Sequence, residues 1–171
     1  VKNSIFSNNS AVFANGGGIS TAGTLEVLDS TFSGNIAEGD GGGIYNGSES
    51  TLTVVGSTFS ENSVAPDGWG GAIYNSDYGV ISVENSTFVK NSAGSGGAVF
   101  NYRNPFYTST LTITNSTFSE NSAVYNGGSI FNFGTLNLTN SILANSVTGN
   151  DCYHDDFNGG TIGVVVNNLI E

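Results

Sequence analysis

The chain has very little positive charge. Lys2, Lys90 and Arg103 are its only bases among 171 residues, and 14 acids bring the net charge to −11. Proteins that bind nucleic acids or anionic membrane surfaces neutralise phosphates with clustered Lys and Arg side chains, and three bases cannot form such a cluster. We therefore expect no nucleic-acid partner. Because charged residues make up only 10% of the chain, the surface must consist mainly of neutral polar side chains.

Long apolar runs, helical patterns and cysteine pairs are missing as well. No apolar run approaches the roughly 20 residues that cross a bilayer, so we expect no direct membrane insertion by this segment. No window offers the roughly 10–12 residues of 3.6-residue periodicity that a helix needs. Cys152 is the only cysteine, which excludes an internal disulfide. It is either a small buried apolar residue or the partner of a cysteine outside this chain.

The chain is rich in small and polar residues. Gly (25), Asn (23), Ser (23) and Thr (16) make up half of it. Such a composition also occurs in disordered chains, but here 37% of the residues are apolar and they recur at regular positions, which disordered chains do not show.

An internal repeat covers nearly the whole chain. The segment Ser-Thr-Phe-Ser-x-Asn, or a looser copy of it, begins at residues 4, 30, 57, 86, 116 and 141, which are 26, 27, 29, 30 and 25 residues apart. Each full copy continues with a glycine pair before an apolar residue, as in Gly70-Gly71-Ala72-Ile73, and closes with an alternating segment such as Thr51-Leu52-Thr53-Val54. Alternation of apolar and polar residues is typical of strands.

Three short strands per repeat, each too short to be stable alone, predict an all-β fold: a right-handed, single-stranded parallel β-helix (solenoid) of about six turns with no long helix. Residues 1–171 would form one domain, and equivalent residues would stack inside it. The expected ladders are Phe6, Phe32, Phe59, Phe88, Phe118 and Leu143; Leu25, Leu52, Ile81, Leu111, Leu136 and Ile162; and Val27, Val54, Val83, Ile113, Leu138 and Val164.

Asparagines mark two expected corners of the coil. Stacked Asn side chains can bond to backbone amides that the strands leave unpaired, and Asn tolerates the left-handed conformation of a sharp bend. The glycine pairs would serve the same backbone purpose. The two sets are Asn9, Asn35, Asn62, Asn91 and Asn121, and Asn46, Asn75, Asn101 and Asn132.

Phe-Ser-x-Asn paired with Gly-Gly-Ala-Ile resembles the repeat of the chlamydial polymorphic outer-membrane proteins, which are autotransporter passengers. The match is closest at Phe59-Ser60-Glu61-Asn62 with Gly70-Gly71-Ala72-Ile73, and it covers about residues 3–140. The resemblance implies an extracellular, surface-bound β-helix with a role in adhesion or surface structure. We expect the chain to be part of a longer surface protein or of an assembly.

Three features with aromatic side chains are candidate binding sites. Tyr45, Tyr74, Phe100 and Phe131 would form an outward aromatic stripe if alternation holds, or lie inside if the corner breaks it. The insertion Tyr102–Ser109 adds Tyr102, Arg103, Phe106 and Tyr107, and loops inserted into a regular coil commonly carry binding. Trp69, the sole tryptophan, is the next candidate.

A dense polar segment lies near the C-terminal end. Asp151, His154, Asp155 and Asp156 could supply oxygen ligands to a hard cation such as calcium, although their spacing fits no EF-hand. The alternative is a solvated loop that replaces the glycine-pair strand of the sixth turn. We expect no other cofactor.

These observations favour an extracellular structural or adhesive module of a bacterial surface or secreted protein, without catalysis. Its partners would be a host or neighbouring surface protein, a glycan, or copies of itself end to end. A carbohydrate-active enzyme is the first alternative, but it needs paired carboxylates, and Glu38, Asp40 and Asp67 are scattered among loops. Glu61 and Glu120 flank Lys90 as a charge-compensated ladder. An ice-binding or fibre-forming solenoid, suggested by ranks of Thr such as Thr31, Thr58, Thr87 and Thr117, is the second.

Overall fold

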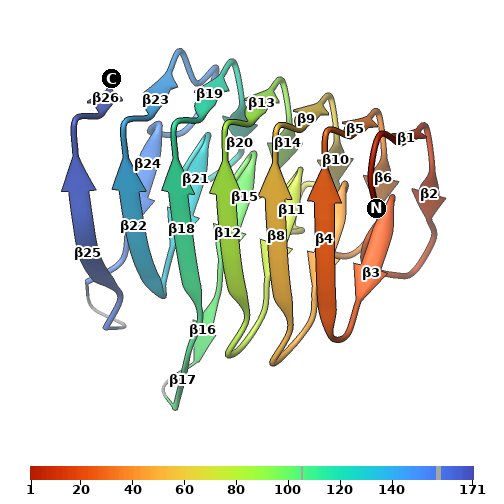
Figure 1. Ribbon diagram of the computed structural model, residues 1–171, viewed down its shortest axis with the longest axis horizontal. Helices are drawn as coiled ribbons and strands as arrows, with labels where there is room; N and C mark the ends of the chain where they lie inside the picture. Colours follow the sequence, from red (N-terminus) through yellow and green to blue (C-terminus); the bar gives the residue numbers. More distant parts are fainter. Residues whose placement is uncertain (105, 157–158) are drawn as a thin grey trace.

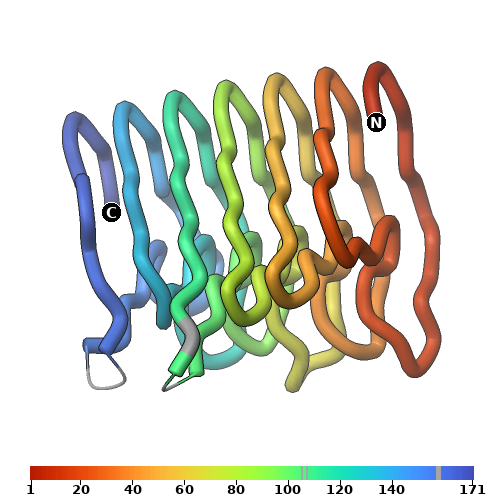
Figure 2. Tube along the Cα trace, turned by 60° about the horizontal axis from the view of Figure 1, so that its bottom comes forward, coloured from red at the N-terminus to blue at the C-terminus, as the bar shows by residue number. Residues whose placement is uncertain are grey.

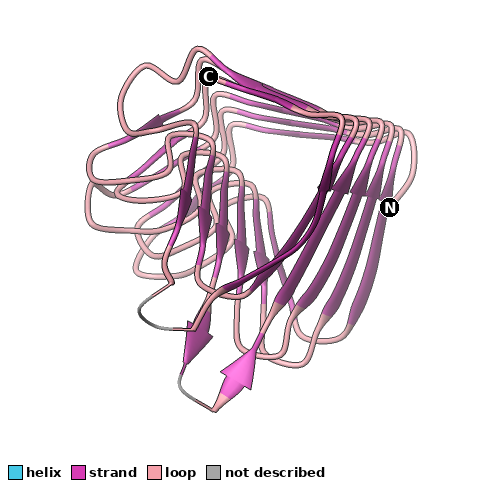
Figure 3. Ribbon diagram, turned by 90° about the vertical axis from the view of Figure 1, so that its left-hand side faces the viewer, coloured by secondary structure: helices cyan, strands magenta, loops and turns pink. Residues whose placement is uncertain are grey.

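The computed structural model describes residues 1–104, 106–156 and 159–171 and shows a coil built only of strands and turns (Figure 1). Viewed from the C-terminal end, the chain winds anticlockwise as it approaches the viewer, so the coil is right-handed (Figure 3). The two termini lie at opposite ends of the stack (Figure 2). Among the described residues there is no helix with the length and hydrophobicity to cross a bilayer.

Four parallel sheets run along the coil, and the first holds the repeated Phe. Phe32, Phe59, Phe88 and Phe118 are fully buried, and successive rings stack with centroids 4.5–4.8 Å apart, which is the spacing of paired strands. The strands are, in spatial order, β1 (Ile5–Ser7), β5 (Thr31–Ser33), β9 (Thr58–Ser60), β13 (Thr87–Val89), β19 (Thr117–Ser119), β23 (Ile142–Ala144) and β26 (Leu169–Ile170).

The second sheet corrects the expectation of three strands per turn to four. Its strands have only two residues, too few to show any alternation in the sequence, and Ala37, Val64 and Ala93 form a small core of their own beneath them. They are β2 (Ser10–Ala11), β6 (Ile36–Ala37), β10 (Ser63–Val64), β14 (Ser92–Ala93) and β20 (Ser122–Ala123).

The third and fourth sheets contain the apolar dyads and the longest strands. The third comprises β3 (Ile19–Thr21), β7 (Ile44–Asn46), β11 (Ile73–Asn75), β15 (Val99–Asn101), β21 (Ile130–Asn132) and β24 (Cys152–His154). The fourth comprises β4 (Thr24–Leu28), β8 (Thr51–Val55), β12 (Val80–Glu84), β18 (Thr110–Thr114), β22 (Thr135–Thr139) and β25 (Thr161–Val166).

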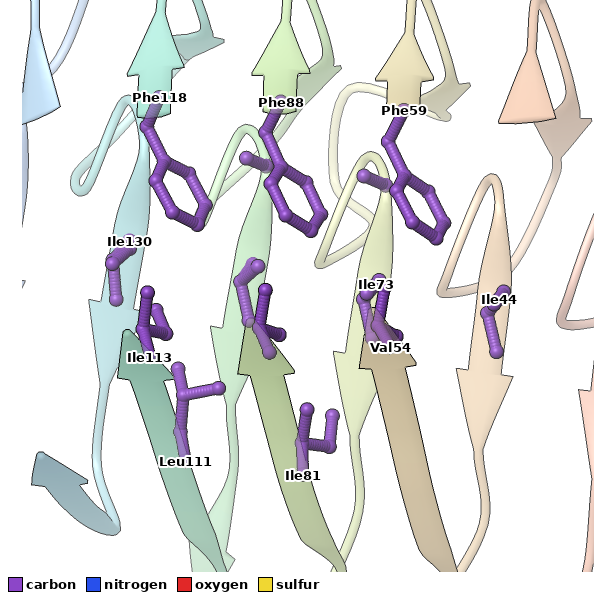
Figure 4. Packing of buried hydrophobic residues seen from close by; sticks show 14 of the residues in the cluster. Ile44, Val54, Phe59, Ile73, Ile81, Phe88, Leu111, Ile113, Phe118 and Ile130 are labelled. Carbon is purple, nitrogen blue, oxygen red and sulfur yellow. The ribbon is translucent and has the colours of Figure 1, made fainter. Parts of the chain in front are cut away.

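Inward side chains of the first, third and fourth sheets meet in one core (Figure 4). The Phe and Leu ladders are confirmed in register, but the end of the Val ladder was wrong. Leu138 pairs with Val165, not Val164, because β25 carries one extra residue and the register shifts there. The amide oxygen of Asn137 accepts the freed N–H of Val164 at 3.0 Å. Such bulges are not visible in a repeat pattern.

Two ladders of buried Asn side chains run along the corners, as predicted. At the first, Nδ2 of each Asn before Asn121 donates to Oδ1 of its counterpart one coil on, at 2.8 Å for Asn35 to Asn62 and 3.0 Å for Asn62 to Asn91. At the second, the corresponding distance from Asn75 to Asn101 is 2.8 Å. Since a buried unpaired amide costs about 1–3 kcal/mol, each Asn depends on its neighbours.

The left-handed residues of these bends are not the ladder Asn themselves. At the first Asn corner the positive φ falls one residue earlier, for example at Gly34 (61°), Glu61 (57°) and Lys90 (56°). The two glycines before the third-sheet strand are required for different reasons. Gly41 has φ 68°, whereas the next residue, Gly42, is needed for space, because a Cβ there would lie 2.4 Å from the carbonyl oxygen of Gly71.

Removing one rung of the Asn ladder should destabilise the coil strongly. Asn62 accepts from the backbone and side-chain amides of Asn35 and donates to the Phe32 carbonyl and to Asn91. We expect Asn62→Ala to lower the free energy of unfolding by about 3–5 kcal/mol, because several buried groups lose partners. Urea titration followed by circular dichroism measures this. Asn126→Ala, in a loop outside the ladder, is the control, and equal effects of the two variants would contradict the prediction.

Extending the second Asn ladder by one rung should stabilise the protein. Oδ1 of Asn46 is buried and has no hydrogen-bond partner among the described residues, because its counterpart one coil earlier is Thr21 rather than Asn. We expect Thr21→Asn to donate to this oxygen and to raise the free energy of unfolding by about 1 kcal/mol. Thr24→Asn, on the exposed surface of β4, should give no gain in the same urea titration. A loss of stability in Thr21→Asn would show that the ladder cannot be extended here.

Candidate functional site

The aromatic residues of the third sheet point away from the main core but are not a surface stripe. Alternation holds: Ile73 packs in the main core, whereas Tyr74, Phe100 and Phe131 form a separate aromatic cluster on the other face of the sheet. Their exposed fractions are only 1–6%, so neither alternative holds as stated: the side chains point away from the main core but are covered, and Tyr74 is not available to a surface ligand. Tyr45, at one end, is half-buried.

Side chains from the irregular segments cover this aromatic cluster. The Trp69 ring lies nearly parallel to that of Phe100, with centroids 5.1 Å apart, and Tyr102 lies 6.2 Å from Trp69. Phe133 contacts Phe131 edge-on at 4.7 Å. The predicted binding residues Trp69 and Tyr102 are therefore brought together, and both also have a packing role that a sequence pattern does not reveal.

Trp69 is anchored at its backbone and open at its ring. Its N–H donates to Oδ1 of Asp40 at 2.9 Å, and 38% of its surface is exposed. A cavity of about 260 Å³ lies beside it, lined by Glu38, Gly39, Asp40, Asp67, Gly68 and Trp69. The three acids, which the sequence shows as scattered, therefore meet at one place, because residues 38–40 and 67–69 follow the second-sheet strands of adjacent coils.

The charged residues that line this cavity are all acidic. Burial raises the pKa of Asp40 above its usual value, and the negative charge of Asp67 raises it further, while the hydrogen bond from Trp69 acts against both. The pKa of the Tyr74 hydroxyl is also raised, mainly by burial and then by the charge of Asp40. It stays a neutral phenol across the physiological pH range.

The insertion forms an antiparallel hairpin that projects from the coil (Figure 3). β16 (Arg103–Asn104) pairs with β17 (Tyr107–Thr108), and Phe106 at the turn is 83% exposed. The Ser109 hydroxyl closes the base by donating to the carbonyl oxygen of Tyr102. Pro105 and the side chain of Tyr107 lie outside the described part of the structure.

Arg103 does not sit at the tip of this hairpin. Its guanidinium lies close to Gly159 in the last coil, so this side chain of the hairpin points toward the C-terminal end of the stack.

The predicted ion pair between Lys90 and Glu120 is present. Lys90 Nζ lies 3.7 Å from a carboxylate oxygen of Glu120, and both side chains are more than half exposed.

The predicted calcium ligands serve different local purposes. Asp151 is buried and accepts the N–H of Ser146 at 2.9 Å. His154 continues the second Asn ladder: its Nδ1 lies 2.9 Å from Asn132 Nδ2, and its Nε2 lies 2.8 Å from Asp156. Within residues 1–104, 106–156 and 159–171, no three acidic, His or Cys side chains are grouped to hold a metal ion. Asp155 precedes the turn that follows β24, and the calcium site stays a prediction.

The comparisons with known proteins agree with the repeat. A family model of the Chlamydia polymorphic membrane protein repeat matches residues 29–47 and 56–76, which include the Phe-Ser-x-Asn and glycine-pair motifs of two successive coils. The resemblance seen in the sequence is thereby confirmed for these two coils. No curated protein and no solved structure shows a significant match to the chain.

The single cysteine should be chemically inert in the folded protein. Cys152 packs against the main core, and burial, with a further contribution from the charge of Asp151, raises its pKa to about 11. Because only the thiolate reacts, we expect alkylation by iodoacetamide at pH 8 to be on the order of 100-fold slower in the native than in the urea-unfolded protein, and to accelerate as the pH approaches 11. Mass spectrometry of the time course measures both rates. Similar rates in the two states would contradict the packing of this partly buried thiol against the core.

Proposed function

We propose that this chain is an extracellular, non-catalytic structural module of a bacterial surface or secreted protein, which binds a host or neighbouring surface protein or a glycan. The observation that carries the proposal is the hairpin β16–β17. It is an antiparallel insertion in a coil whose stacked sheets are all parallel, and its turn exposes Phe106. Aromatic side chains are enriched among the residues that anchor protein interfaces, so an exposed Phe on a loop that projects from the coil supports contact with a partner.

The distribution of chemistry supports a binding role over a catalytic one. Glycoside hydrolysis needs two carboxylates on either side of a bound sugar chain, whereas the cavity beside Trp69 measures about 260 Å³ and is smaller than typical ligand clefts of roughly 300–1,000 Å³. Elsewhere the repeated polar residues have structural partners: the Asn form the ladders, and Ser30 and Ser57 accept backbone amides of the preceding coil through their hydroxyls.

Substituting the hairpin should abolish adhesion without affecting the fold. We expect the protein to be retained on a glycan array or on cultured animal cells, and Phe106→Ser and Tyr107→Ala each to reduce retention by about tenfold or more, as for a central interface aromatic. Tyr125→Ser, which alters an exposed aromatic in another loop, is the matched control and should bind normally.

Two results would contradict the proposal. Retention unchanged in both hairpin variants would move binding elsewhere on the coil. Release of reducing or unsaturated sugars from a polysaccharide would show that the protein is a carbohydrate-active enzyme.

A further inference from the structure

The cavity beside Trp69 is a preformed feature of two adjacent coils. Residues 38–40 belong to one coil and residues 67–69 to the next, and glycines hold the two backbones close together. A Cβ on Gly68 would lie 2.6 Å from the carbonyl oxygen of Gly39. The N–H of Trp69 bonds to Asp40 across the same step. The cavity therefore exists before any ligand arrives, and binding there requires little reorganisation.

Trp69 is one of the residues that line this cavity, and its indole is supported on one side by the aromatic cluster. The Trp69 ring packs on Phe100 at 5.1 Å with an interplanar angle of 14°, and Phe100 is itself 1% exposed. The part of Trp69 that is not used in this packing, 38% of its surface, is open. An indole face presents negative electrostatic potential and attracts cations.

The rest of the lining is acidic and lacks a counter-charge. Glu38, Asp40 and Asp67 are the only charged groups among the described residues that line the cavity. Of the three bases, Lys90 pairs with Glu120, Arg103 lies against Gly159, and Lys2 forms a backbone bridge with Leu28 in the first coil. A neutral sugar would leave the repulsion between Asp40 and Asp67 in place, whereas a cation would relieve it.

We propose that this cavity binds the cationic end of a lysine or arginine side chain in a basic segment of the partner protein. The ammonium or guanidinium would lie over the Trp69 indole with Asp40 and Asp67 as counter-charges. The volume of about 260 Å³ suits one side-chain end, and the net charge of −11 attracts basic segments at long range. This inference deepens the proposed binding role by naming the ligand chemistry at the Trp69 loop.

Titration with a basic peptide tests the proposal directly, because Trp69 is the only tryptophan and its fluorescence reports on the cavity alone. We expect hexalysine to change this fluorescence saturably, and a hexamer of Nε-acetyl-lysine, which lacks the charge, to bind about tenfold more weakly or not at all. Affinity should fall as the pH is lowered through the raised pKa of Asp40, since protonation removes a counter-charge.

Isosteric variants separate the cavity from the general acidity of the protein. Asp40→Asn keeps an acceptor for the Trp69 N–H, and Asp67→Asn alters an exposed side chain, so both should fold. Each should weaken hexalysine binding by about threefold or more. Glu61→Gln removes one charge at a distant corner and is the matched control. Trp69→Phe, followed by calorimetry, should also weaken binding.

The proposal fails if the acetylated hexamer binds as well as hexalysine, or if the Asp variants bind like Glu61→Gln. It also fails if a neutral galacto-oligosaccharide changes the Trp69 fluorescence and hexalysine does not, since the cavity would then be a sugar site. These outcomes are independent of the hairpin. If Phe106→Ser loses retention and hexalysine does not bind, the proposed function stands and the cavity proposal fails. If hexalysine binds and Phe106→Ser keeps its retention, only the role of the hairpin is refuted.

Discussion

The structure depends on one constraint: each residue stacks on its counterpart in the next coil. The Phe rings satisfy it by near-parallel stacking, and the corner amides satisfy it by donating to one another along two buried ladders. A slip of one residue would turn every Phe outward and place the Asn amides opposite groups that cannot accept them. The polar ladders therefore specify the register, whereas the apolar core contributes most of the burial.

The constraint applies only at the strands and corners, and the loops between them are free to vary. Repeat spacings of 25–30 residues still produce the same register in the fourth sheet from β4 to β22. The insertion after Asn101 is closed at its base by Ser109, whose hydroxyl donates to the carbonyl oxygen of Tyr102. Chain can thus be added at this point without disturbing the coil, which is why binding features collect in such loops.

The repeat predicted the coil because equivalent residues of successive repeats lie next to each other in the stacked sheets. It failed where the chain leaves the period. The bulge that shifts Val164 and Val165, and the two-residue strands of the second sheet, leave no recurring pattern. The burial of Tyr74 depends on Trp69 and Tyr102, which come from different loops, and the residue that pairs with Trp69 in the next coil is Ser95 rather than an aromatic. Glu38, Asp40 and Asp67 were visible as acids, but their meeting is a consequence of loop paths.

The aromatic cluster links the coil to the candidate site. Phe100 is held by the third sheet and packs against Tyr74 and Phe131 along the stack, so the ring beneath Trp69 has the rigidity of the coil. Trp69 thus keeps its position although it belongs to an exposed loop, and Asp40 anchors its backbone from the neighbouring coil. A loop supported in this way can present an indole and carboxylates in fixed geometry. The protein has few positive charges to neutralise these carboxylates. At this fixed negative site, charge complementarity would favour a basic partner over a neutral or acidic one.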